Sequence, residues 1–231
     1  MDMLTYVEFA EKIMKMPIVL VPLGSFEQHG PSGYLGADYV VANHIAKKIS
    51  KMMDIISLPC LPFGFSEIHS NFPGTVSFGF DLYESVVTTI INDLRRHGVK
   101  KIVFINGHGG NAMPLKEVIE MEDICWIEWF ALTKNIFFEN EHKSHAGSEE
   151  LSLLAHIDSD YVSQNLVQDM IPSKLGIDWR SMPPIDRKTE YLSENGVFFY
   201  ANKWSPDIGK EIEEFVVDRI MEIINKFILD I

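Results

Sequence analysis

The chain has 231 residues, of which 46% are hydrophobic and 23% are charged, a balance that fits one globular domain with a sizeable core. Its formal net charge of −13 repels phosphate backbones and anionic lipid, so nucleic acid and membranes are unfavourable partners. The first 15 residues lack the basic and apolar regions of a signal peptide, and no apolar run reaches the roughly 20 residues of a membrane helix. We therefore expect a cytoplasmic protein.

The predicted elements alternate between apolar runs typical of buried strands and segments with helical periodicity. Strands are expected at 17–24, 55–64, 101–106 and 124–132, and helices at 37–53, 81–97, 113–121, 147–157 and 207–230. Asp81 is the expected N-cap of the second helix, and Gly98 is its stop. Pro59 and Pro62 indicate that the second strand is irregular or lies at an edge. This alternation predicts a three-layer α/β/α fold with a mostly parallel central sheet, formed as one domain by residues 1–231.

Two further features of the sequence carry predictions. Residues 163–195 are polar, contain three prolines and show little periodicity, which is typical of a functional loop, so we predict a lid or pocket loop there. The two cysteines, Cys60 and Cys125, lie in apolar runs and are expected to be buried, reduced thiols, without a disulfide.

Polar clusters follow two of the predicted strands directly, and a third cluster opens a helix. Glu27 and His29 follow the first strand, with Asp38 nine residues further on, and His108 follows the third strand within Asn-Gly-His-Gly-Gly-Asn. Ligands of an open parallel sheet bind beyond the carboxyl ends of its strands, so these side chains are expected to converge. Imidazole and carboxylate together suit Zn²⁺, Mn²⁺ or Fe²⁺, and an aspartate shared by two ions would hold them roughly 3.5–4 Å apart.

Each cluster also has a simpler interpretation. A single histidine after a strand is usually a hydrogen-bonded polar residue, and His44, His97, His142 and His156 are expected to be structural or solvated. The glycine-rich loop around residue 108 could be a nucleotide-phosphate turn, although it lacks the glycine spacing and the lysine of known phosphate loops. His69, in the loop after the second strand, could support the site or face the substrate.

Taken together, the motifs resemble the creatininase family of metal-dependent amidohydrolases. The resemblance covers Pro-Leu-Gly-Ser-Phe-Glu-Gln-His-Gly-Pro, the aspartate nine residues past its histidine, Phe-Pro-Gly-Thr, Ile-Asn-Gly-His-Gly-Gly-Asn and His-Ala-Gly-Ser-Glu-Glu-Leu-Ser, in that order between residues 20 and 210. It implies the same three-layer fold and a centre with two divalent ions. By resemblance, Glu27 binds one ion, His29 binds the other, Asp38 bridges both, His108 is a further ligand, and Glu150 ligates or supports the second ion.

The resemblance also implies roles in catalysis. His145, with Glu150 as the alternative, would pass a proton to the leaving nitrogen after a metal-activated water attacks an amide carbonyl. We further predict His69, Ser32 and Asn111 as substrate contacts. The substrate would be a small molecule, and the protein a homo-oligomer, either a dimer or a hexamer, as in the family.

Two departures from the family pattern bear on the substrate. The creatinine-hydrolysing branch has a glutamate two residues after the loop histidine, where this chain has Gly110, and many members have Pro-His where this chain has Pro31-Ser32. The chain looks most like the archaeal branch that deformylates a formamidopyrimidine nucleotide and is associated with Fe²⁺. Its phosphate would need basic groups, for which the candidates are Arg180, Arg187, Lys188 and Lys203. Creatinine hydrolysis, peptide hydrolysis and a non-catalytic metal-binding role remain as alternatives.

Overall fold

The computed structural model describes residues 4–134, 136–138, 145–170, 193–197, 201 and 203–229. His142, the basic candidates Arg180, Arg187 and Lys188, and most of the predicted lid at 163–195 lie outside these residues. The lid therefore stays a prediction. Within the described part of the chain, no helix is both long enough and apolar enough to span a membrane.

The regular elements follow one another along the chain in this order: α1 Tyr6–Lys15, β1 Ile18–Leu23, α2 Ala37–Met53, β2 Ile56–Ser57, η1 Glu67–His69, α3 Phe80–Arg96, β3 Lys101–Asn106, η2 Gly109–Ala112, α4 Lys116–Ile119, β4 Ile124–Glu128, α5 Trp129–Leu132, α6 Ser148–Ile157, η3 Ser159–Tyr161, η4 Gln164–Asp169 and α8 Pro206–Ile228. The helix α2 and the strand β3 have the predicted bounds.

The strands form one parallel sheet in the order β2-β1-β3-β4. The central strands β1 and β3 are paired along their whole length, from Ile18 opposite Lys101 to Leu23 opposite Asn106. The carboxyl ends of these two strands are therefore neighbours, and the segments that follow them start side by side. This pairing brings the two main polar clusters of the sequence together.

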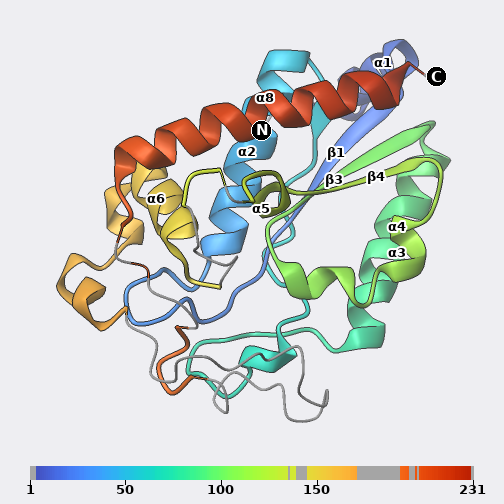
Figure 1. The fold of residues 1–231 in the computed structure, drawn as a ribbon. Helices are drawn as coiled ribbons and strands as arrows, with labels where there is room; N and C mark the ends of the chain where they lie inside the picture. Colours follow the sequence, from blue (N-terminus) through green and yellow to red (C-terminus); the bar gives the residue numbers. More distant parts are fainter. Residues whose placement is uncertain are drawn as a thin grey trace.

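Side chains of the central strands alternate between two cores, because successive residues of a strand point to opposite faces. Ile18 and Leu20 join the core that includes buried residues of α2, α6 and α8, whereas Val19 and Val21 join the core that includes buried residues of α1, α3 and α4. Figure 1 shows α8 along one side of the strands and α3 with α4 along the other. The sheet is thus the middle layer of the predicted three-layer α/β/α fold.

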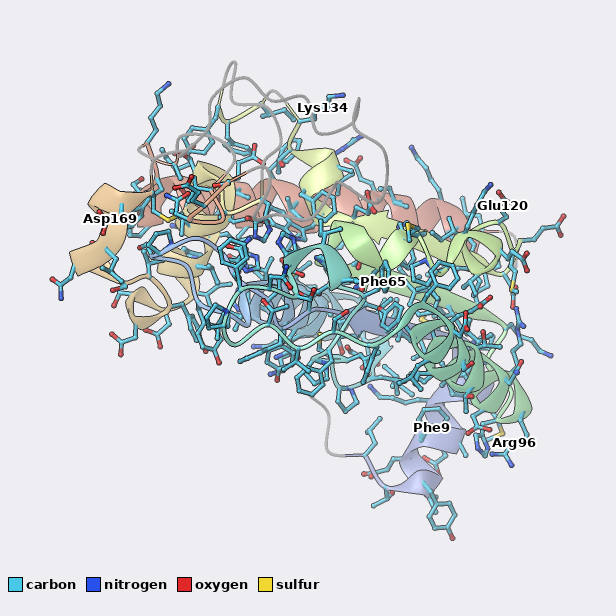
Figure 2. The ribbon with its side chains drawn as sticks, turned by 90° about the horizontal axis from the view of Figure 1, so that it is seen from below. Phe9, Phe65, Arg96, Glu120, Lys134 and Asp169 are labelled. Carbon is cyan, nitrogen blue, oxygen red and sulfur yellow. The ribbon has the colours of Figure 1, made fainter. Side chains whose placement is uncertain are left out.

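Helix α1 was not predicted from the sequence. Thr5 and Glu8 form a capping box at its start, which satisfies amide groups that have no partner within the helix. Only Ile13 of this helix is buried. In Figure 2, Phe9 of α1 lies near Arg96 at the end of α3, and Asp169 lies at the opposite end of the molecule. Because α1 leads directly into β1, it stands at the amino ends of the strands, away from the polar clusters.

Several predicted bounds need correction. Gly79, not Asp81, is the N-cap of α3, and Asp81 lies in the first turn of this helix. The run expected as a strand at 124–132 turns into helix α5 after Glu128, and the run at 55–64 keeps only two strand residues, at the edge of the sheet. Apolar content alone does not distinguish a buried strand from a buried helical turn. Helix α4 is also shorter than the predicted 113–121.

The cysteines are free thiols, as predicted. Cys60 is buried and Cys125 is half-buried, so only the first matches the expected burial. Burial raises the pKa of the Cys60 thiol well above its usual value and that of the Cys125 thiol to about 11. Both groups therefore stay protonated and unreactive near neutral pH.

Candidate metal centre

Asp38 is the centre of the polar cluster at the carboxyl ends of β1 and β3. It lies in the first turn of α2, where the partial positive charge of the helix terminus favours a carboxylate. Its Oδ1 is 3.3 Å from Nε2 of His29, and its Oδ2 is 3.1 Å from Nδ1 of His108. The hydroxyl of Ser25 donates a hydrogen bond of 2.6 Å to Oδ2. The two carboxylate oxygens thus face different imidazoles, as a bridging ligand requires.

Glu27 is fully buried, and neither of its carboxylate oxygens receives a hydrogen bond from the described part of the chain. Three imidazole nitrogens nevertheless surround Oε1: Nδ1 of His108 at 3.2 Å, Nε2 of His69 at 3.3 Å and Nδ1 of His145 at 3.4 Å. A buried carboxylate without hydrogen bonds is costly unless another positive group compensates for it. Oxygen and nitrogen ligands that converge without bonding to one another are the arrangement expected around a cation.

The outer nitrogens of both predicted ligand histidines are bonded to main-chain carbonyls. His29 donates from Nδ1 to the carbonyl of Glu27 at 3.0 Å, and His108 donates from Nε2 to the carbonyl of Phe65 at 2.9 Å. These bonds occupy the outer nitrogens, so the inner nitrogens that face Asp38 are the ones that a cation would bind after displacing their protons. Metal-binding histidines are held in the same way, because the second hydrogen bond sets the tautomer and the ring orientation.

Glu150 joins the cluster from the first turn of α6. Its Oε2 accepts a hydrogen bond of 2.6 Å from the main-chain N–H of Ala146, which turns the carboxylate towards the centre. His29, Asp38 and Glu150 can each offer one ligand atom such that all three atoms lie within 4.8 Å of one another.

Two further sets of three residues can also each offer three ligand atoms that lie within 4.8 Å of one another. They are Glu27 with Asp38 and His108, and Glu27 with His29 and His145. The set that contains Glu150 and the set that contains His108 have only Asp38 in common. The residues present therefore fit two cations that share one aspartate.

The pKa shifts of the clustered imidazoles and carboxylates show how strongly their charges interact. Burial opposes the charged form of His29, but Asp38 outweighs it and raises the pKa of this imidazole to about 10. Burial would raise the pKa of Asp38, yet His29 and His108 hold it well below its usual value. Burial raises the pKa of Glu150 to about 7. Protons on the imidazoles thus balance the carboxylates, and a bound cation would have to displace them.

His69 and His145 lie beside the predicted ligands. Their rings are stacked, with centroids 4.2 Å apart, and His145 also lies 4.5 Å from the ring of His29. His69 is buried, in η1, and His145 precedes α6. The structure therefore brings all three polar clusters of the sequence, and His69 with them, to one place.

Asn111 and Ser32 have different surroundings from those expected of substrate contacts. Asn111 is fully buried, its amide nitrogen donates to the carbonyl of Gly24 and to Oδ1 of Asn106, and its oxygen accepts from the N–H of Phe65. The hydroxyl of Ser32, also buried, donates to the carbonyl of Ser163. These bonds show that both side chains fix neighbouring loops, and their contact with a substrate stays a prediction.

The sequence patterns missed two buried residues of this site, Ser25 and Gln28. Both stand within the same segment as Glu27 and His29, but neither is a typical metal ligand. Of the histidines expected to be structural, His44 forms an ion pair with the buried Glu213, and Nε2 of His156 lies 3.5 Å from the same carboxylate. His97 caps the end of α3.

Comparison with known proteins identifies the family. The model of the creatininase family, described as creatinine amidohydrolase, matches residues 2–224. The chain belongs to the creatininase family. Named members of this family hydrolyse C–N bonds, as in creatinine and a formyl amide, and one relative is named as a peptidase.

Relatives and solved structures agree with this family. The chain is 33% identical over 158 residues to the mycofactocin precursor peptide peptidase of Mycolicibacterium smegmatis, an alignment that covers 64% of this chain and only 60% of the peptidase. It is 24% identical over 237 residues, 95% of each chain, to the 2-amino-5-formylamino-6-ribosylaminopyrimidin-4(3H)-one 5'-monophosphate deformylase of Methanococcus maripaludis. The crystal structure of a creatinine amidohydrolase (creatininase) superposes with a TM-score of 0.81 over 97% of this chain and 95% of that chain, at 23% identity, which confirms the creatininase-like fold.

Proposed function

We propose that this member of the creatininase family is a metal-dependent amidohydrolase with two divalent ions. Glu27, Asp38 and His108 would hold one ion, and His29, Asp38 and Glu150 the other. The observation that carries the proposal is the buried carboxylate of Glu27: three imidazole nitrogens lie within 3.4 Å of Oε1, yet among the residues that the structure describes none forms a hydrogen bond with it. A metal-binding homologue without activity would share this arrangement, so turnover must be assayed directly.

The donor set is compatible with more than one metal. Imidazole and carboxylate ligands accept Zn²⁺, Mn²⁺ and Fe²⁺. Related solved structures are described as a Zn–Zn type creatininase and as a manganese creatininase. We favour Fe²⁺ because the chain resembles the deformylase branch, which is associated with this ion.

The residues around the centre supply binding and proton transfer. Divalent ions bound here would lower the pKa of a water and polarise an amide carbonyl. Ser25 and the main-chain carbonyls of Glu27 and Phe65 hold Asp38, His29 and His108 in place. We assign His145 to proton transfer, because its Nδ1 lies 3.4 Å from Oε1 of Glu27, next to both ligand sets. Nδ1 would take a proton from the attacking water and pass it to the leaving nitrogen.

The best-supported substrate is the formamidopyrimidine nucleotide named above, from which the enzyme would release formate in riboflavin and coenzyme F420 biosynthesis. The alignment with the archaeal deformylase runs through 95% of both chains. Gly110 also argues against creatinine, because the creatinine-hydrolysing branch has a glutamate at this position and this chain has no room for one. A Cβ here would come within 2.3 Å of Nε2 of His108 and 2.4 Å of the carbonyl oxygen of Phe65. Lys203, which is exposed, is the one described candidate for the substrate phosphate.

A second candidate is hydrolysis of a peptide. It is favoured by the 33% identity to the mycofactocin precursor peptide peptidase, although that alignment covers 60% of the peptidase. The same donor set would serve either reaction, because both hydrolyse an amide. The substrate assay must therefore include a peptide.

The test is a comparison of three substrates on protein purified without oxygen and loaded with Fe²⁺, Zn²⁺ or Mn²⁺. The formamidopyrimidine nucleotide, creatinine and a model peptide would be assayed for formate, creatine and free amine. We expect formate release that a chelator abolishes and added metal restores. No formate from any loaded form would refute the deformylase proposal, and free amine from the peptide would favour the second candidate.

A matched pair of variants tests the metal centre itself. Asp38→Asn keeps the shape of the side chain but removes the charge shared by both ligand sets, so bound metal and turnover should both be lost. Asp81→Asn makes the same change at an exposed position in α3 and should leave both unchanged. Full metal content in Asp38→Asn would contradict the two-ion centre. The predicted oligomer, a dimer or a hexamer, is tested by light scattering on the purified protein.

A further inference from the structure

Gln28 is the buried residue between two predicted ligands, Glu27 and His29, and no role follows for it from the metal centre. Its side chain is 5% exposed. The amide nitrogen lies 3.0 Å from Nδ1 of His69, 2.8 Å from Nε2 of His145 and 3.4 Å from the carbonyl oxygen of Gly196. One side chain thus touches the loop after β2, the segment before α6 and the segment 193–197.

The orientation of this amide is set by main-chain groups on both sides. Its oxygen accepts a hydrogen bond of 2.9 Å from the N–H of Gly30, and its nitrogen donates to the carbonyl of Gly196. A flipped amide would lose both bonds and place its oxygen against the carbonyl. The packing is tight, since a Cβ on Gly196, which has a φ of +80°, would overlap Oε1 of Gln28 at 1.8 Å.

The fixed amide determines where the proton of His69 lies. Because the amide nitrogen can only donate, Nδ1 of His69 must accept its hydrogen bond. The proton of the neutral imidazole is then on Nε2, the nitrogen that lies 3.3 Å from Oε1 of Glu27. His69 therefore presents an N–H to the metal centre.

The main-chain carbonyl of Gln28 determines the proton position of His145, which is opposite to that of His69. Nε2 of His145 is 2.5 Å from the carbonyl oxygen of Gln28. A carbonyl only accepts, so Nε2 carries the proton and Nδ1 carries the lone pair. The amide nitrogen of Gln28 also lies 2.8 Å from this Nε2, but the carbonyl oxygen is closer, so the carbonyl decides the proton position. Nδ1 lies 3.4 Å from Oε1 of Glu27, so His145 presents a lone pair to the same centre.

We propose that Gln28 is a positioning residue that fixes opposite proton positions on the stacked rings of His69 and His145. One imidazole offers the centre a proton and its neighbour accepts one, as the hydrolysis of an amide requires of an acid and a base. The effect of Gln28 on turnover rests on the proposed function, whereas its effect on the proton positions of the two histidines does not.

The experiment compares Gln28→Glu with the matched control Gln164→Glu, which makes the same change at an exposed position in η4. A carboxylate at position 28 has no N–H, so Nδ1 of His69 would become the donor and its proton would move from Nε2 to Nδ1. Long-range ¹H–¹⁵N NMR of the zinc-loaded protein reports which ring nitrogen carries the proton, and a His69→Asn variant assigns the signal.

We expect wild type and Gln164→Glu to show His69 protonated on Nε2, and Gln28→Glu to show it protonated on Nδ1. His145 should keep its Nε2 proton in all three proteins, because the main-chain carbonyl is unchanged. A wild-type His69 protonated on Nδ1, or the same tautomer in Gln28→Glu, would overturn the proposal. If Gln28→Glu does not fold, Gln28→Met replaces it, and the expected result is loss of the single fixed tautomer of His69.

Kinetics provide the second measurement, with whichever substrate the wild type hydrolyses. Loss of a residue that orients groups around a metal typically lowers activity about 10- to 100-fold. We expect that loss in kcat, with KM and zinc content unchanged, because Gln28 is buried behind the two imidazoles. An unchanged kcat would overturn the proposal. If the wild type hydrolyses none of the substrates, the proposed function fails, and the NMR result still decides the positioning role.

Discussion

Replacing Gly110 with alanine adds one methyl group at the most crowded point behind His108. The new Cβ would lie 2.3 Å from Nε2 of His108 and 2.4 Å from the carbonyl oxygen of Phe65, where contacts of 3.4 Å and above are ordinary. Imidazole or backbone must therefore move by about 1 Å in a close-packed interior. The residue has no positive φ, so the backbone conformation itself would accept alanine. The effect is therefore purely steric.

The expected cost has two parts. Overpacking of a core costs about 1–3 kcal/mol, and breaking the 2.9 Å hydrogen bond from His108 to Phe65 leaves a buried carbonyl unsatisfied at about 1–3 kcal/mol. We expect Gly110→Ala to lower the free energy of unfolding by about 2–6 kcal/mol. Displacing a ligand histidine from its second hydrogen bond should also weaken metal binding about 10- to 100-fold.

The neighbouring glycine provides the control. A Cβ on Gly109 would have its nearest contact at 3.9 Å, with the ring of Phe130, so Gly109→Ala should change stability by less than about 0.5 kcal/mol. The assays are denaturant unfolding of the metal-free proteins and zinc titration against a chromophoric chelator. If the two variants unfold alike and bind zinc equally, the argument that Gly110 makes room for the histidine is refuted.

Two further predictions concern the scaffold. Glu213→Gln removes a carboxylate that is 4% exposed and paired with Lys48 and His44. We expect it to lower the free energy of unfolding by about 2 kcal/mol at pH 7. The exposed control, Glu214→Gln, should lower it hardly at all. Burial opposes the charged form of Glu213, but the hydrogen bonds from Lys48 and His44 outweigh it and hold the pKa of this carboxyl below its usual value. The stabilisation is therefore fully present above the usual pKa of a glutamate and is lost as the pH falls through the lowered pKa. A difference between wild type and Glu213→Gln that does not shrink on acidification would contradict this. Asn111→Ala breaks three buried hydrogen bonds between site loops and should cost about 2–4 kcal/mol in denaturant unfolding, and an unchanged midpoint would contradict the fixation role.

Much of the fold was predictable because buried helices and strands have characteristic patterns of apolar residues in the sequence. The bounds of α2 and β3 were predicted correctly, because the apolar residues of α2 recur with the helical period and β3 is a continuous apolar run, as in a strand buried on both faces. The carboxyl ends of parallel strands meet at one edge, so the position of Glu27 after β1 and of His108 after β3 indicated that they would approach each other. These inferences need only the order of elements along the chain.

Other features depended on contacts that cannot be predicted from the periodicity of the sequence. The helical turn α5, the approach of His69 to Glu27 and the pairing of Glu213 with α2 each join residues whose proximity arises only when the layers pack. Asn111 shows the difference most clearly: the sequence placed it in the correct loop, but its three hydrogen bonds, and not its position, determine its role. The sequence alone determined which segments meet at the sheet edge, because periodicity reports the buried face. Only the tertiary structure decided which atoms face one another there, because hydrogen bonds form over about 3 Å between groups far apart in the chain.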